Sequence, residues 1–373
     1  MTINSKLSVL VFTRDLDRYS VNMLCEIVRL GHVVHVVTEP PSSVRSHDWS
    51  SQISIVDEVA LSGRFDKRAA RSYANLVEKY KADVCLCYTS RALSVALTAR
   101  RNYKFNVPII GTRGAIGGVS AFYLQDWFSY LAPSLDAVVC MSQAIANKLT
   151  LEARRLYARH PGRFLAIYPG YGQLMETHEP PTQRKRLVTD EVRLLCVAND
   201  RPIKGLMLLL DAAEKYLQTR NWRLDIVGQC GDAIRDRIEN SQLLFKHVVA
   251  HGFRSDVIDF FRRAHIYIQP TLQPGEGIGN SMAEAMSFGL PVVTSNVGGG
   301  IELTSHEYTG IHFKANDSYS LAQAIDRLVF DPEACDSIGL AAATTLNNKF
   351  SLASEALAFL NLFELLITQR RQK

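Results

Sequence analysis

Short runs of apolar residues alternate with amphipathic segments from the start of the chain. Residues 7–12 form one apolar run, residues 18–30 show helical periodicity and stop at Gly31, and residues 32–38 form the next run. Continuous apolar runs of this length are typical of buried strands, and a 3.6-residue period indicates a helix. The pattern continues with strands predicted at 82–88, 107–111 and 137–141 and helices at 90–99, 123–132 and 143–157. Because helices separate the strands, the first half predicts a doubly wound parallel sheet.

A second series of the same kind follows a change in composition. Residues 168–186 are rich in Pro, Gly and charge, which indicates a linker between domains. Beyond it we predict strands at 194–198, 223–227, 247–250, 265–269, 291–295 and 311–314, then a final helix from Glu355 to Gln369 with Ser354 as its N-cap. The sequence therefore predicts an α/β protein with two Rossmann-like domains, residues 1–170 and 187–350, and a C-terminal helix (355–373) that packs back on the first. Two such domains can face each other across a cleft, a favoured place for ligands.

The richest local pattern is the stretch 269–300, QPTLQPGEGIGNSMAEAMSFGLPVVTSNVGGG. It predicts a strand, a Gly-rich loop, a helix over about 280–288 closed by a left-handed Gly289, and a second strand. Its special residues thus lie at the carboxyl ends of parallel strands, where open α/β sheets bind ligands. Backbone N–H groups gather at the helix N-terminus, where the helix dipole favours a phosphate. These groups belong to Gly277, Ile278, Gly279, Asn280 and Ser281.

Two carboxylates flank this helix start, Glu276 in the loop and Glu284 eight residues later in the helix. A carboxylate accepts hydrogen bonds from two hydroxyl groups, which suits a sugar ring or a ribose diol. A diphosphate on the amides, with hydroxyl groups on the two acids, would make a nucleotide-sugar site. The alternative is that the glycines only permit close packing and that Glu284 is an ordinary solvated residue.

Composition narrows the class of protein. With 47% hydrophobic and 21% charged residues the chain is typical of a soluble globular protein, and we find no apolar run of about 18 residues that would cross a bilayer. It begins without a secretory signal, and its seven cysteines are scattered, mostly within apolar runs. We therefore expect a cytoplasmic protein with buried reduced thiols and no zinc site. The first turn, residues 13–17, lacks GxGxxG, which argues against a NAD- or FAD-dependent oxidoreductase.

Charge differs between the two halves. Residues 1–183 hold 21 Lys and Arg against 15 Asp and Glu, a net charge of +6, whereas the remainder holds 21 against 22. This asymmetry predicts an anionic partner at the first half, such as membrane phospholipid or a lipid-phosphate acceptor. We therefore expect that peripheral membrane contact through this half can hold the protein at the inner face of the membrane. Nucleic acid would fit the charge, but the sequence shows no nucleic-acid-binding motif.

Most of residues 190–330 resemble the retaining GT-B glycosyltransferases of family 4. The resemblance is carried by Lys204-Gly205 after a strand, by GFRSDV at 252–257, by PGEGIGNSMAEAMSFGLPVV with its two glutamates, and by VGG-x-x-EL. In the first half, DAVVCMS at 136–142 also fits the family. The resemblance implies two Rossmann-like domains, with the donor nucleotide sugar on the second and the acceptor on the first.

Carried over residue by residue, the resemblance implies a role for each matched position. Glu276 would hold hydroxyl groups of the donor sugar, and Glu284 those of the ribose. Lys204 would bind the phosphates together with the amides of the helix start. Phe253 and Arg254 would line the base, chiefly through main-chain groups. Two of these assignments have structural alternatives, because Lys204 could be a solvated residue at a helix start and 253–254 could be a turn.

The sequence departs from the family pattern at three places. Asn199 stands where the family usually has an arginine before the lysine, and Arg201 could take over at the phosphate. In the first domain TRD at 13–15 replaces a Gly-Gly turn, and GTRG at 111–114 occupies the place of a common histidine. Arg14 and Arg113 are therefore candidates for the acceptor or phosphate side of the site. A salt bridge at a strand end is the alternative for Arg113.

The expected function is transfer of a sugar from a UDP- or GDP-sugar to a saccharide or lipid-linked acceptor, with retained anomeric configuration. Glu276, Lys204 and Arg201 are the candidate catalytic residues, because charge on the leaving diphosphate needs preorganised partners. We expect no cofactor and no metal, and interpret Asp15-Leu16-Asp17 as a helix cap. By family habit the product would belong to bacterial cell-envelope polysaccharide or glycolipid. A GT-B sugar-nucleotide epimerase and a non-catalytic nucleotide-sugar-binding protein are the alternatives.

Overall fold

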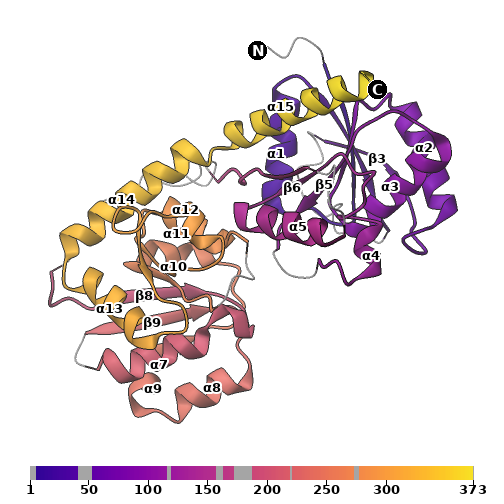
Figure 1. Ribbon diagram of the computed structural model, residues 1–373. Helices are drawn as coiled ribbons and strands as arrows, with labels where there is room; N and C mark the ends of the chain where they lie inside the picture. The colour runs from indigo at the N-terminus through magenta and orange to yellow at the C-terminus, as the bar shows by residue number, and fades with distance from the viewer. Residues whose placement is uncertain are drawn as a thin grey trace. The chain divides into compact units, whose positions relative to one another are not determined.

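The computed structural model describes residues 6–40, 53–115, 119–156, 163–171, 187–218, 221–272 and 277–372. The chain divides into two units. Unit 1 holds residues 1–170 and 352–373, and unit 2 holds residues 171–351. Each unit is a parallel sheet covered by helices (Figure 1). The predicted α/β class with two Rossmann-like domains is therefore confirmed.

Unit 1 contains a seven-stranded sheet in the order β3-β2-β1-β4-β5-β6-β7, with each neighbouring pair parallel. Its strands are β1 (Ser8–Thr13), β2 (Val33–Thr38), β3 (Ser54–Glu58), β4 (Val84–Cys87), β5 (Ile109–Arg113), β6 (Ala137–Cys140) and β7 (Arg163–Ala166). Its helices are α1 (Arg18–Arg29), α2 (Lys67–Lys79), α3 (Ser90–Tyr103), α4 (Leu124–Trp127), α5 (Gln143–Leu156) and α15 (Leu352–Arg371). The strand order reverses between β1 and β4, which makes their carboxyl ends a topological switch point.

Apolar side chains on the two faces of this sheet form separate cores. One face packs against α2, α3 and α5, and the other against α1 and α15. The second core joins distant parts of the sequence, because Phe359 and Phe363 of α15 lie in one cluster with Val9 and Val11 of β1. Figure 1 shows α15 (yellow) beside α1. Since each large apolar side chain buried in such a core contributes about 1.5–3 kcal/mol, α15 is an integral part of unit 1.

A buried ion cluster fixes the end of α15. The carboxylate of Asp136, just before β6, contacts two nitrogen atoms of Arg370. It accepts a hydrogen bond from Nε at 2.8 Å and forms an ion pair with Nη2 at 2.7 Å. The same carboxylate accepts a hydrogen bond from the backbone N–H of Ile109 at 2.8 Å. Arg100 of α3 completes the cluster with a second ion pair to Asp136. Burial lowers the pKa of the Arg100 guanidinium, and the Asp136 carboxylate opposes that shift. An ion pair with a carboxylate that is itself hydrogen-bonded offsets the cost of burying a guanidinium group.

The start of α15 carries a buried carboxyl group. Glu355 is 9% exposed and accepts the backbone N–H of Gly170 at 2.7 Å, where the chain leaves unit 1. Burial raises the pKa of Glu355 to about 8. The carboxyl is therefore mostly neutral at pH 7, which avoids an isolated charge in the core.

Unit 2 contains a six-stranded sheet in the order β10-β9-β8-β11-β12-β13, again with parallel neighbours. Its strands are β8 (Val192–Val197), β9 (Trp222–Val227), β10 (Val248–Ala250), β11 (Ile266–Gln269), β12 (Val292–Ser295) and β13 (Gly310–Phe313). Its helices are η3 (Pro202–Lys204), α7 (Leu206–Tyr216), α8 (Asp232–Glu239), α9 (Gln242–His247), α10 (Val257–Arg263), α11 (Asn280–Ser287), α12 (Gly300–Leu303), α13 (Ser318–Val329) and α14 (Pro332–Lys349). The order reverses between β8 and β11, so the switch point of this sheet lies at Val197 and Gln269.

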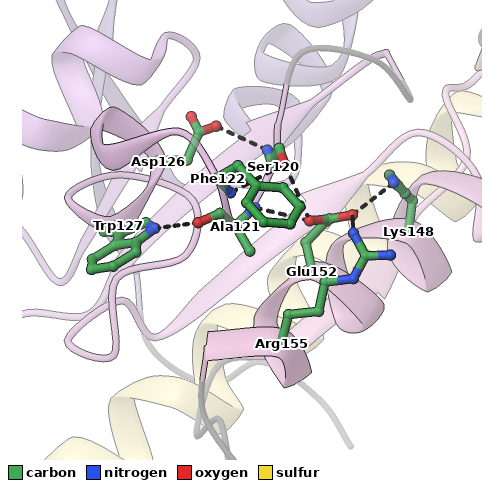
Figure 2. Close-up of polar contacts among 8 residues, drawn as sticks. All are labelled: Ser120, Ala121, Phe122, Asp126, Trp127, Lys148, Glu152 and Arg155. Carbon is green, nitrogen blue, oxygen red and sulfur yellow. Dashed lines mark hydrogen bonds and ion pairs between the residues drawn. The ribbon is translucent and has the colours of Figure 1, made fainter.

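The predicted helix over 123–132 is wrong beyond one turn. Only α4 is helical, and turns follow it. Asp126 accepts the backbone N–H of Ser120 (3.0 Å), and the Trp127 ring nitrogen donates to the carbonyl of Ala121 at 2.8 Å (Figure 2). Such side chain–backbone bonds satisfy the chain locally and compete with a continued helix.

Other predictions of local structure have mixed outcomes. Ser354 is not an N-cap, because α15 already begins at Leu352. The strands β3 and β7 and the helix α2 were not predicted. Asp17 does cap α1, since its carboxylate accepts the N–H of Ser20 at 2.8 Å. All seven cysteines are free thiols and six of them are buried, as predicted.

The expectation that no segment could cross a bilayer needs correction. Within the described residues, the helical stretch Pro332–Arg371 contains an 18-residue window with a mean hydropathy of 1.6, which is long and apolar enough to cross a membrane by length and composition alone. Half of the apolar window is buried in the structure. The same composition arises in a helix that contributes to a protein core, as α15 does.

Candidate functional site

The switch point of unit 2 brings Lys204 to the loop that follows β11. Lys204 ends η3 and is half-buried. The backbone N–H of Leu272 donates to the carbonyl of Ile203 at 2.9 Å, which joins the η3 turn to the residues after β11. The turn that carries Lys204 therefore lies against the residues that directly follow β11.

Gly205 makes this approach sterically feasible. Its φ is +69°, and a Cβ atom there would overlap the backbone carbonyl oxygen of Pro270 and lie 2.9 Å from a methyl carbon of Leu272. A side chain is disfavoured both by the left-handed backbone and by the neighbouring carbonyl. The structure thus explains why a glycine follows Lys204, because only a residue without a Cβ atom lets the η3 turn pack directly against the end of β11.

The amides predicted to meet a diphosphate lie at the start of α11. Gly277 and Gly279 are buried, Ile278 is half-buried, and Gly279 is the N-cap of the helix. Close contacts hold this loop, since a Cβ on Gly279 would lie 2.5 Å from the side-chain amide of Gln269 and one on Gly299 would overlap the Gly277 carbonyl. The loop after β12 therefore packs on the loop after β11, and glycines permit it.

Polar side chains of the helix start are tied to the sheet. The Ser281 hydroxyl accepts a hydrogen bond from the Tyr267 hydroxyl (2.8 Å) and donates to the carbonyl of Val197 (3.2 Å). Asn280 is exposed, and its Oδ1 accepts from the hydroxyl of the fully buried Tyr171 at 3.0 Å. These bonds fix the helix axis over the switch point, so the backbone of Ser281, rather than its hydroxyl, is the group left to meet a ligand.

The sequence reasoning gave no role to Gln269, which ends β11. Its side chain is 5% exposed, and its Oε1 has no hydrogen-bond partner among the residues described. A buried polar atom without a partner is costly unless something binds it. An amide that ends an apolar strand directly before a Gly-rich loop is the sequence signal that would have pointed to Gln269.

The two glutamates have different outcomes. Glu284 lies one helical turn after Asn280 in α11 and is half-buried, so it shares a helix face with the helix start. Glu276 lies outside the described residues, as do residues 273–275. The described residues on either side, Leu272 and Gly277, both make close contacts at the switch point.

The residues around Arg201 explain one departure from the family pattern. Asn199 accepts the backbone N–H of Gln229 at 2.9 Å, and Asp200 accepts that of Gly231 at 3.1 Å. The two side chains therefore hold the loop between β9 and α8. Arg201 is exposed and precedes η3. It stands beside the turn that carries Lys204, which is compatible with a phosphate-binding role.

Phe253 and Arg254 lie in the loop after β10. The Phe253 side chain is 85% exposed. Arg254 forms two hydrogen bonds with Asp256, at 2.8 and 2.7 Å, which raises the pKa of the guanidinium. The aromatic ring is thus presented to solvent, where a planar base could stack, while the arginine side chain is occupied by its neighbour.

The two arginines of unit 1 lie at the carboxyl edge of its sheet. Arg14 follows β1 and lies 3.7 Å from the carboxylate of Asp15. Arg113 ends β5, donates from Nε to the carbonyl of Ala115 at 3.0 Å, and covers the ring of Tyr130 at 5.4 Å. The two arginines lie at the ends of different strands, and these ends share one edge because the strands of the sheet are parallel.

A further acid at this edge was missed. Glu39 follows β2, is 6% exposed, and its carboxylate is 3.5 Å from the hydroxyl of Thr89. Burial raises the pKa of Glu39, and the charges of Arg91 and Arg14 oppose that shift. A shielded carboxyl group beside two arginines at a strand end is suited to hold hydroxyl groups of a ligand.

Metal ligands do not gather in the part of the chain that the structure describes. Within it, no group of three or more His, Cys, Asp or Glu side chains is arranged to hold a metal ion. What the switch point of unit 2 offers instead is a lysine, helix-start amides and a buried amide oxygen. This set suits an anionic ligand with neighbouring hydroxyl groups.

Two family models match the chain. The model described as Glycosyl transferases group 1 matches residues 191–331, and the model described as Glycosyltransferase Family 4 matches residues 16–170. The two matches follow the two units of the structure.

Individual proteins give shorter or weaker likenesses. The capsular polysaccharide biosynthesis glycosyltransferase CapM of Staphylococcus aureus is 33% identical over 109 residues, 29% of this chain and 27% of that protein. The UDP-Gal:alpha-D-GlcNAc-diphosphoundecaprenol alpha-1,3-galactosyltransferase of Escherichia coli is 31% identical over 137 residues, 35% of this chain and 34% of that protein. The matched stretches thus span only about a third of these curated relatives. Among solved structures, Anabaena HepE in complex with UDP superposes with a TM-score of 0.74 at 16% identity, covering 96% of this chain and 100% of that one.

Proposed function

Because the chain belongs to the GT-B glycosyltransferases of family 4, we propose that it transfers a sugar from a nucleoside-diphosphate sugar to a saccharide or lipid-linked acceptor. The observation that carries the proposal is the packing of the Lys204-Gly205 turn on the end of β11, next to the amide groups at the start of α11. A cation and free N–H groups at a switch point are the elements that a diphosphate needs.

The proposed reaction replaces one bond at the anomeric carbon. The bond to the diphosphate oxygen breaks, the acceptor oxygen bonds to the same face of the ring, and the acceptor proton passes to the leaving phosphate. Lys204, Arg201 and the amides of 277–281 stabilise the charge that accumulates on the diphosphate, which is the largest contribution in many enzymes. Glu276 holds the sugar, Glu284 the ribose hydroxyls, and no metal is required because the cations neutralise the phosphates.

A UDP-sugar is the proposed donor. UDP is bound in the HepE structure, and the name of the E. coli relative specifies UDP-Gal and a lipid-linked diphosphate acceptor. A saccharide or lipid-linked acceptor in bacterial envelope synthesis is proposed on the same grounds, since CapM is named for capsular polysaccharide. Arg14, Arg113 and Glu39 at the carboxyl edge of unit 1 are the proposed contacts for such an acceptor.

Calorimetry with nucleoside diphosphates tests the diphosphate site. Lys204→Ala removes a charge-assisted contact of about 1.5–3 kcal/mol, so the affinity for UDP should fall about 10-fold to 100-fold. Lys215→Ala is a matched control, because Lys215 lies near the other end of α7. Equal affinities of Lys204→Ala and the wild type would refute the phosphate role of Lys204.

Product analysis tests the reaction. A UDP-sugar panel with a saccharide acceptor, followed by NMR, should give a product whose anomeric configuration matches the donor, and Glu276→Gln should abolish it while UDP still binds. The donor incubated alone should stay unchanged. An epimer formed without acceptor would favour the epimerase, and donor binding without any transfer would favour a binding protein.

A further inference from the structure

Unit 1 exposes a group of large apolar side chains around one short segment. Exposed fractions reach 85% for Phe122, 63% for Leu124 and 54% for Tyr123. Three further side chains extend the group, because the rings of Phe65 and Phe128 meet edge to face at 5.0 Å and Trp127 is 39% exposed. We call this set the aromatic patch: Phe65, Phe122, Tyr123, Leu124, Trp127 and Phe128. Contiguous exposed apolar surface of this kind marks interaction sites.

Buried polar bonds hold the segment in place. Glu152 of α5 is fully buried and accepts the backbone N–H of Ala121 at 2.8 Å (Figure 2). Lys148 and Arg155 each pair with the same carboxylate at 2.7 Å. Although burial acts to raise it, the Ala121 N–H and these two cations keep the pKa of Glu152 at about 2. The apolar side chains are therefore displayed on an anchored segment.

Cations outnumber carboxylates among the solvent-accessible charged groups around the patch. The side chains of Lys148 and Arg155 are 40% and 56% exposed, and Arg64, next to Phe65, donates to Gln125 at 3.2 Å. Two carboxylates of the neighbourhood, Glu152 and Asp126, are buried, and a third, the half-buried Asp66 next to Phe65, caps the start of α2. Apolar side chains combined with exposed cations complement an anionic lipid surface, where aromatic rings sit at the head-group level.

We propose that the aromatic patch docks unit 1 on a bilayer that contains anionic phospholipid. Phe122 and Leu124 enter the acyl boundary, and Lys148 and Arg155 lie among the lipid phosphates. Both chain segments of the patch come after carboxyl ends of strands, β3 before Phe65 and β5 before residues 122–128, and Arg14 and Arg113 lie at that same edge of the sheet. Docking would bring a lipid-linked molecule to that edge. The proposal adds a place of action to the proposed function, and its test needs neither donor nor acceptor.

Vesicle sedimentation tests the docking. The wild-type chain should sediment with vesicles of equal parts phosphatidylcholine and phosphatidylglycerol, and much less with phosphatidylcholine alone. Phe122→Ser with Leu124→Ser should weaken binding about 100-fold, because each large apolar side chain contributes about tenfold. Phe245→Ser is the matched control, since Phe245 is 70% exposed on α9 of unit 2, and should bind as the wild type does.

Fluorescence reports the contact directly. The chain has three tryptophans, of which Trp222 is buried. In a Trp49→Phe background, adding the anionic vesicles should shift the emission of Trp127 to shorter wavelength. Failure of the wild type to bind these vesicles, or equal binding by the double variant, would overturn the proposal. So would self-association in sedimentation velocity that the double variant loses, because the patch would then be covered by a second copy.

Discussion

The Gly205→Ala substitution separates the role of a close approach from that of a left-handed backbone. Gly205 and Gly252 have nearly the same φ, +69° and +68°. A Cβ on Gly205 would overlap the Pro270 carbonyl oxygen, whereas a Cβ on Gly252 would meet nothing within 4 Å. Gly252→Ala is therefore a matched control that carries only the backbone cost.

The expected magnitudes follow from these surroundings. A left-handed alanine costs about 1–2 kcal/mol, of which up to ~1 kcal/mol is offset by the lower entropy of the unfolded chain. Gly252→Ala should therefore destabilise unit 2 by about 1 kcal/mol. Overpacking against a backbone carbonyl adds about 1–3 kcal/mol, so Gly205→Ala should cost about 2–4 kcal/mol. For a unit of this size, each 1 kcal/mol lowers Tm by about 2–4 °C.

Thermal unfolding and calorimetry are read together. Gly205→Ala should lower Tm by roughly twice to four times as much as Gly252→Ala, given the free energies above. It should also weaken UDP binding about tenfold or more, since the lysine turn can relieve the overlap only by moving away from β11. Equal Tm values for the two variants would refute the close approach. A destabilised Gly205→Ala with wild-type UDP affinity would refute the placement of Lys204 at the phosphates.

Two further predictions concern unit 1. Because the pKa of Glu355 is about 8 in the folded protein against 4.5 ordinarily, the unfolded chain loses this proton first, and stability should fall as pH rises between these values, by at most about 5 kcal/mol. The Glu355→Gln variant keeps an oxygen that accepts the N–H of Gly170 but does not ionise. Its Tm should therefore exceed that of the wild type at pH 8 and equal it below pH 4.5. If the Tm of both proteins depended on pH in the same way, Glu355 would not be a buried neutral carboxyl group. Arg370→Ala removes two contacts to Asp136 and should cost about 1–3 kcal/mol by denaturant unfolding, whereas the exposed Arg371→Ala should change stability little. Equal free energies of unfolding for Arg370→Ala and Arg371→Ala would show that the ion cluster does not stabilise the packing of α15.

The sequence sufficed for the features that depend on local pattern. Apart from β3 and β7, the described strands of both sheets stand out as apolar runs. Gly289 closes α11 with a φ of +69°, as its place after the helix predicts. Lys204-Gly205 could be singled out by resemblance, although the reason for the glycine, the Pro270 carbonyl, lies 65 residues along the chain and cannot be seen locally.

The features that failed depend on distant partners. Asn199 was interpreted as a lost arginine, but its acceptor oxygen holds Gln229 on the next strand's loop. The segment after Tyr123 has helical periodicity, yet its side chains bond the preceding backbone and Glu152 anchors it from α5. A role for Gln269 was not predicted, because it depends on the burial of its Oε1 atom, which has no hydrogen-bond partner among the described residues.

The packing of α15 on β1 and α1 has a consequence for how the protein is made. Ribosomes deliver residues 1–170 first, but one face of that sheet lacks Phe359 and Phe363 until residues 352–371 have been translated. The residues of unit 2 have all been translated before then, so unit 2 can fold while one face of the first sheet is still uncovered. A nonsense mutation near residue 350 would thus leave unit 2 nearly complete but remove α15 from unit 1. One face of the sheet in unit 1 would then expose apolar side chains, which chaperones bind.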